Sequence, residues 1–131
     1  MKKTGLLNQP LSTVIAGLGH MDTLCVADAG LPIPSSTHRI DLAVTDGVPG
    51  FLAVLDAILG EMQVEGAVIA QEMATVSPQM HMAIMERLTD IDVRVVLHED
   101  FKQETTNSVA IARTGEFTPY ANVILIAGVV F

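Results

Sequence analysis

Four histidines are the side chains of this 131-residue sequence best suited to proton transfer at neutral pH, namely His20, His38, His81 and His98. His20 follows a glycine at the point where a predicted helix gives way to a predicted strand, whereas His98 ends a strand and begins a helix. His38 lies in a long loop, and His81 lies in a methionine-rich helix without polar neighbours. We therefore interpret His20 and His98 as the candidate functional histidines.

Two of the candidate polar groups directly follow predicted strands. Asp28 follows the apolar run 23–27, and His98 follows the run 93–97. In open α/β sheets the carboxyl ends of the strands line the binding crevice, so we expect Asp28 and His98 to lie together. Lys102 comes one helical turn after His98, which allows both side chains to share one face.

The last predicted strand is entered through Tyr120, Ala121 and Asn122, which bring a hydroxyl and an amide. Together with Asp28 and Lys102, these groups can both donate and accept hydrogen bonds. Such a set suits a neutral ligand that carries several hydroxyl groups, for example a sugar.

Other chemistries find little support in the sequence. His20, Asp28 and His98 could surround a metal ion, but no close pair such as HxH or HxxxH is present, so we predict no metal. The nucleotide motifs GxxxxGK[ST] and GxGxxG are absent, as is the hydrolase motif GxSxG, and we predict no cofactor. The single cysteine, Cys25, lies in an apolar run and is interpreted as structural.

Composition narrows the possible partners. Seven Lys and Arg residues against fifteen Asp and Glu residues give a net charge of −8, which argues against nucleic-acid binding. No apolar stretch is long enough for a membrane span, and the two lysines near the start precede no signal-peptide block, so we expect a cytoplasmic protein. Half of the residues are hydrophobic and only 17% are charged, which favours a homo-oligomer.

Strand and helix patterns alternate along the chain, which predicts the α/β class. We expect a single compact domain spanning residues 1–131, with a mostly parallel central sheet and helices on both faces. A segment without clear periodicity, 29–48, is expected to be a long loop. The predicted helices are 8–18, 49–60, 78–88 and 98–105, and the predicted strands are 23–27, 64–70, 93–97, 108–112 and 122–131.

Several segments together resemble the D-ribose pyranase family over residues 1–131: LGHMDTLCVADAGLPIP, HEDFKQET and ARTGEFTPYANVILIAGVVF. The sequence resembles the related L-fucose mutarotases less closely. The resemblance implies an isomerase that interconverts the pyranose and furanose forms of β-D-ribose, supporting ribose uptake and phosphorylation. A fucose-type mutarotase and a non-catalytic sugar-binding protein are the alternatives.

The resemblance also implies roles for individual residues. His20 is implied to be the catalytic acid, and sugar contacts are implied for Asp28, His98, Lys102 and the segment 120–122. The resemblance further implies ring-shaped decamers, without metal or cofactor. The sequence departs mildly from the family at residue 21 and in the loop after GLPIP, which affects loop detail alone.

His20 and Asp28 flank the same predicted strand. An extended strand rises about 3.3 Å per residue, so the two side chains would lie roughly 20 Å apart in one chain. Either the chain before the strand doubles back, or a pocket takes His20 from one subunit and Asp28 from another. We favour the second arrangement, because it also accounts for the apolar composition.

Overall fold

The computed structural model describes residues 1–131. Its elements are α1 (Gln9–Gly17), β1 (Thr23–Ala27), β2 (His38–Asp41), α2 (Phe51–Leu59), β3 (Val64–Ala70), α3 (Glu72–Val76), α4 (Pro78–Arg87), β4 (Asp92–Val96), α5 (His98–Glu104), the 3₁₀ turn η1 (Thr105–Asn107), β5 (Ala110–Arg113) and β6 (Val123–Ala127).

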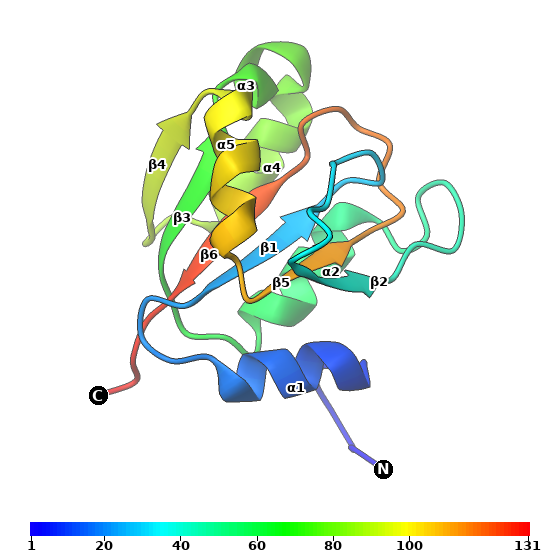
Figure 1. Ribbon diagram of the computed structural model, residues 1–131, viewed down its shortest axis with the longest axis vertical. Helices are drawn as coiled ribbons and strands as arrows, with labels where there is room; N and C mark the ends of the chain where they lie inside the picture. The colour runs from blue at the N-terminus through cyan, green and yellow to red at the C-terminus, as the bar shows by residue number, and fades with distance from the viewer.

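The strands form one six-stranded sheet in the order β2-β5-β1-β6-β3-β4. β2, β5 and β1 run parallel to one another, as do β3 and β4. β6 lies between β1 and β3 and is antiparallel to both (Figure 1). β6 therefore starts at the end of the sheet where the parallel strands finish, and it finishes at the end where they start.

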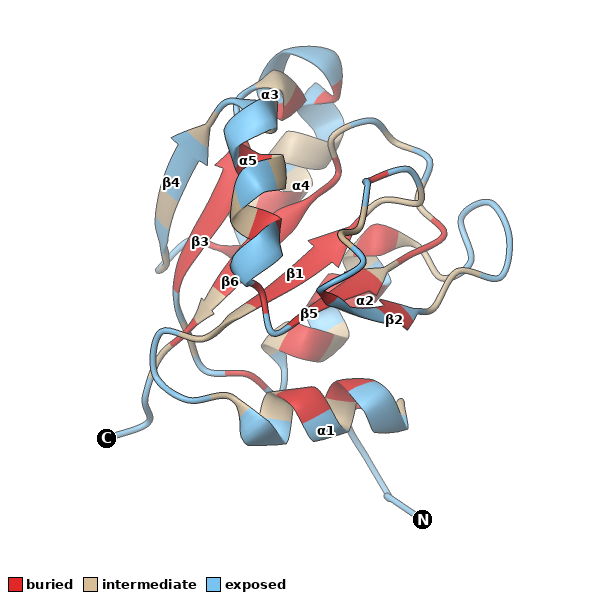
Figure 2. Ribbon diagram, viewed as in Figure 1, coloured by how far each residue is buried: buried red, intermediate tan, exposed pale blue.

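The central strands are apolar on both faces because both faces are covered. In β1, Leu24 and Val26 point into a large core, whereas Cys25 and Ala27 point into a smaller one on the other face. Figure 2 shows the central strands buried, with exposed residues on the outer strands β2 and β4. Phe101 of α5 fills the smaller core.

The helices lie on both faces of this sheet, as predicted. α1, α2, α3 and α4 contribute to the larger core, and α5 covers the opposite face (Figure 1). α1 begins as the sequence indicates, because the Asn8 side chain accepts a hydrogen bond from the Leu11 N–H and Pro10 occupies the first turn. No helix combines the length and the apolar character needed to cross a bilayer.

The α/β class and the mostly parallel sheet are confirmed, and the elements differ from the prediction in several details. The expected loop 29–48 contains the short edge strand β2, which shows one buried residue, Ile40, and therefore little apolar pattern. The short helix α3 was not predicted. The last strand ends at Ala127 instead of Phe131, since residues 129–131 are exposed beyond the sheet.

Candidate active site

A cavity of about 530 Å³ opens at the edge of the sheet where β1 and β5 end and β6 begins. This volume lies within the range of roughly 300–1,000 Å³ typical of small-molecule sites. Asp28 and His98 were predicted to lie together from their strand-end positions, and the structure places them here with Tyr120. The lining residues are 28–32, His98, Arg113 and 116–120.

Asp28 is held in place by the fully buried Asn122. The Asp28 backbone N–H donates to Asn122 Oδ1 at 2.9 Å, and Asn122 Nδ2 donates to Asp28 Oδ2 at 2.8 Å. The Gly30 N–H donates to the other carboxylate oxygen, Oδ1, at 2.9 Å. Each oxygen therefore keeps a lone pair for a further donor, such as a ligand hydroxyl, while its direction is fixed.

His98 is the first residue of α5 and is fixed at its backbone and at its ring. Its backbone N–H donates to both carboxylate oxygens of Glu72, at 3.1 and 3.0 Å. Its ring meets Tyr120 edge-on, with centroids 4.9 Å apart, and stacks near Phe101 at 6.2 Å. The ring nitrogen Nδ1 is buried without any hydrogen-bond partner. A buried polar atom left unpaired costs about 1–3 kcal/mol, so a ligand that pairs with Nδ1 would recover this cost.

Tyr120 reaches His98 through an unusual backbone conformation. Its φ is 63°, in the left-handed region that a bulky side chain rarely adopts. The turn is closed by the Asn122 N–H, which donates to the Tyr120 carbonyl at 2.8 Å, and Ser77 Oγ donates to the Pro119 carbonyl at 2.7 Å. Strain of this kind persists where the surroundings over-determine it, typically at binding sites.

Arg113 and Glu116 also line the cavity, and neither was among the predicted site residues. Arg113 Nε donates to the Ala29 carbonyl at 3.0 Å, and its Nη1 pairs with Asp41 at 3.1 Å. Burial raises the pKa of Asp41, but the hydrogen bonds from Arg113 and the Ala43 N–H outweigh burial and lower this pKa. Arg113 thereby ties the wall around Ala29 to the edge strand β2.

Glu116 anchors the opposite wall. Its carboxylate accepts hydrogen bonds from the Thr118 hydroxyl at 2.7 Å and from the Phe51 N–H at 3.1 Å. Burial raises the pKa of Glu116, yet these hydrogen bonds, with those from the Thr118 and Phe117 N–H groups, bring it below its usual value. The carboxylate is therefore held ionised between α2 and the segment 116–120.

Three predicted contact residues do not line the cavity. Lys102 lies one turn along α5 from His98 and pairs with Glu99 at 2.6 Å. Ala121 belongs to the larger core, and Asn122 lies beneath Asp28. Their predicted sugar contacts stay predictions. No group of three His, Cys, Asp or Glu side chains is arranged so that it could hold a metal ion.

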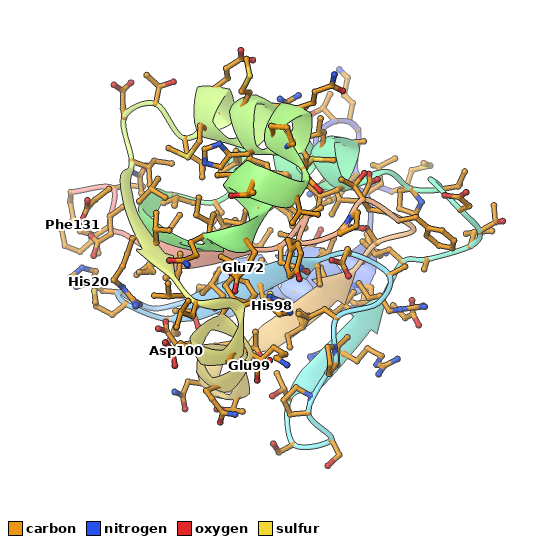
Figure 3. All side chains as sticks on the ribbon, turned by 90° about the horizontal axis from the view of Figure 1, so that it is seen from above. His20, Glu72, His98, Glu99, Asp100 and Phe131 are labelled. Atoms are coloured by element: carbon orange, nitrogen blue, oxygen red, sulfur yellow. The ribbon has the colours of Figure 1, made fainter.

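His20 lies at the opposite end of the strands from the cavity, in the exposed turn that leads into β1. Its Nε2 is 3.0 Å from Glu65 Oε1 and 3.1 Å from Oε2. Figure 3 shows His20 well away from His98 and Glu72. Within one chain the structure therefore separates His20 from the cavity, and the chain before β1 does not double back toward Asp28.

Sequence comparisons relate the whole chain to proteins of known activity. Residues 1–130 match the model of the RbsD / FucU transport protein family. A D-ribose pyranase of Geobacillus thermodenitrificans is 50% identical over 131 residues, covering 100% of this chain and 99% of the relative. A D-ribose pyranase of Escherichia coli O9:H4 is 51% identical over 139 residues and is covered completely.

Solved structures share the fold. Bacillus subtilis RbsD complexed with D-ribose superposes with a TM-score of 0.97 at 40% identity, with both chains covered completely. The fucose mutarotase of Streptococcus pneumoniae, in complex with L-fucose, superposes with a TM-score of 0.80 at 24% identity, covering 95% of each chain. The second similarity extends to the fold alone.

Proposed function

Because this chain belongs to the RbsD / FucU transport protein family, we propose that it is a D-ribose pyranase, an isomerase that interconverts the pyranose and furanose forms of β-D-ribose. The observation that carries this proposal is the full-length superposition on a 40% identical relative whose structure contains D-ribose. The cavity lined by Asp28, His98 and Tyr120 supports it, since a carboxylate, an imidazole and a phenol suit a polyhydroxylated ligand.

Ring exchange breaks and re-forms one carbon–oxygen bond and moves two protons, so acid and base groups are sufficient to catalyse it. Opening the pyranose breaks the bond between the anomeric carbon and the ring oxygen, which takes up a proton while the anomeric hydroxyl loses one. The aldehyde then closes when a different hydroxyl attacks the same carbon, with both proton transfers reversed. General acid–base catalysis of this kind contributes about 10²- to 10⁴-fold.

We assign the acid role to His20, which therefore has to reach a cavity in another copy of the chain. His20 and the cavity lie at opposite ends of β1, roughly 20 Å apart by the rise of a strand. Exposed apolar side chains lie in both regions: Met21 directly follows His20 in the sequence, and Phe117 lines the cavity. Their exposure in a single chain supports contact between copies.

We further propose that the copies form a ring, with ten as the number that the family resemblance implies, and that the protein acts in the cytoplasm. There it would follow ribose entry and precede phosphorylation of the furanose form. No cofactor takes part in this scheme.

The test is the rate at which equilibrated D-ribose exchanges ring forms, followed by saturation-transfer NMR. Wild-type protein should accelerate exchange, and His20→Ala should lower the catalysed rate by about 10²- to 10⁴-fold. His81→Ala is the matched control, because His81 lies on α4 and does not line the cavity. L-fucose in the same experiment distinguishes fucose-type mutarotation, and no acceleration of either sugar would contradict the enzyme assignment.

A further inference from the structure

Glu65 lies at the same end of the sheet as His20, and both residues lie next to the end of β6. Thr23 of β1 and Gly66 of β3 lie on either side of Ile126 in β6. His20 precedes Thr23 by three residues, and Glu65 precedes Gly66 by one. Two side chains that are 45 positions apart in the sequence thus meet beyond one end of one strand.

A β-bulge sets the position of Glu65. Val64 pairs with Ala127 and Gly66 pairs with Ile126, so Glu65 is the extra residue between two consecutive partners. Bulges re-aim side chains and are common beside active sites. Gly128 leaves room for this arrangement, because a Cβ at that position would lie 3.0 Å from the Glu65 Cβ and 3.2 Å from Glu65 Oε2.

The turn that carries His20 is fixed to the same strand. The Gly19 N–H donates to Asp22 Oδ2 at 2.7 Å, which closes the turn around His20. The Met21 N–H donates to the Ala127 carbonyl at 2.9 Å, and the Ala127 N–H donates to the Asp22 carbonyl at 2.8 Å. Met21 adopts a left-handed φ of 71° to make this possible. Both partners of the His20–Glu65 contact are therefore held by backbone geometry.

We propose that Glu65 is a positioning residue for His20, an inference that rests on the proposed function. Both Glu65 oxygens face Nε2, at 3.0 and 3.1 Å. In the neutral imidazole the hydrogen is therefore on Nε2, and the Nε2–H donates a hydrogen bond to the Glu65 carboxylate. Nδ1 makes no hydrogen bond within the chain. Nδ1 carries no proton in the neutral ring, so it takes one from the sugar as a base and, from the imidazolium, gives one back as an acid. Glu65 fixes both the tautomer and the direction of the ring.

A purely structural role would not explain the arrangement. The side chains of His20 and Glu65 are 53% and 40% exposed, and ion pairs this exposed contribute little to stability. Yet a bulge, a glycine and a left-handed residue all serve to bring them together. Carboxylates that orient metal-bound histidines change affinity or activity by about 10- to 100-fold when removed, and we take this range as the guide for Glu65.

The experiment measures kcat and KM for ribose ring exchange in Glu65→Ala and Glu65→Gln. We expect Glu65→Ala to lower kcat by about 10- to 100-fold with little change in KM. Glu65→Gln should recover part of this loss, because its amide oxygen can still accept the Nε2–H. ¹⁵N chemical shifts of the neutral His20 ring should show the Nε2–H tautomer in wild type and a tautomer mixture in Glu65→Ala.

Glu104→Gln is the matched control, since Glu104 also forms an exposed ion pair, with Arg94, and lies outside both site regions. It should leave kcat unchanged. Wild-type kcat in both Glu65 variants, or an unchanged His20 tautomer in Glu65→Ala, would overturn the inference while leaving the pyranase assignment intact. Failure of wild type itself to accelerate exchange would instead refute the proposed function.

Discussion

Tyr120 illustrates how a single residue can be held in an unfavourable conformation at a site. Its left-handed backbone, with φ of 63°, is the one that places its ring edge-on against His98. An L-residue with a side chain pays about 1–2 kcal/mol in this region, whereas glycine adopts it freely. The conformation that brings the phenol to the cavity therefore lowers the stability of the folded chain.

This strain predicts an inverted order of stability at position 120. Tyr120→Gly should unfold with a free energy about 1 kcal/mol higher than Tyr120→Ala, because both variants lose the ring and only glycine relieves the backbone. Urea titrations of the two variants at equal protomer concentration measure the difference. An alanine variant as stable as the glycine variant would show that no strain is stored there.

At the residue level, the sequence predicted that Asp28 and His98 lie together, because both follow strands whose carboxyl ends meet. Tyr120 joins them because β6 runs antiparallel to its neighbours, so that its start lies at the same end of the sheet. Glu65 was missed because a glutamate at the start of an apolar strand reads as a solvated end. Neither the bulge at Glu65 nor the need for a residue without a Cβ at Gly128 can be recognised from a sequence pattern.

At the level of elements, α2 depends on a residue far along the chain for its first turn. Gly50 stands at the N-cap position and provides no side-chain hydrogen bond. Glu116 replaces it by accepting the Phe51 N–H at 3.1 Å, from a carboxylate that also favours the positive end of the helix. The same carboxylate lines the cavity, so α2 and the site are stabilised by one group.

Glu116 should make stability depend on pH in a defined direction. Its pKa is lowered in the folded chain, so its contribution is complete above the ordinary value of 4.5 and is lost as the pH falls through the lower folded value. Glu116→Gln should lower the unfolding free energy by about 1 kcal/mol at pH 7. The difference from wild type should shrink at acid pH in urea titrations.

Glu86→Gln serves as the control for this measurement, because Glu86 is an exposed residue of α4 whose carboxylate makes no hydrogen bond within the chain. It should follow the wild-type pH profile. A constant gap between wild type and Glu116→Gln from neutral to acid pH would contradict the role assigned to the Glu116 carboxylate.

Elements with strong patterns were predicted closely, and weakly patterned ones were missed. β3 was predicted with its observed bounds, since its apolar run is long and bounded by polar residues. β2 is a four-residue edge strand with one buried side chain, too short for period-two alternation to appear. The antiparallel direction of β6 was not predicted, because an apolar run has the same composition in either direction.

For the whole molecule, the proposal requires each copy to contribute two different half-sites. One half contains Asp28, His98 and Tyr120, and the other contains His20 and Glu65. The two halves lie at opposite edges of the sheet, so no single copy brings them together. Activity would then depend on assembly, although the halves themselves are built within each chain.

Mixing two inactive variants tests this arrangement. His20→Ala retains the cavity and Asp28→Asn retains His20, so randomly mixed assemblies should regain about a quarter of the wild-type activity per site. The measurement is ribose ring exchange after the two variants are co-expressed in equal amounts. His20→Ala mixed with the double variant should regain none, and equal failure of both mixtures would show that sites are not shared between chains.

The chain contains one tyrosine and no tryptophan, and that tyrosine lines the cavity. All near-ultraviolet emission characteristic of tyrosine therefore originates beside His98, at the place where a ligand would enter. The protein carries its own optical reporter, so occupancy of the site can be followed in the unlabelled, unmodified chain.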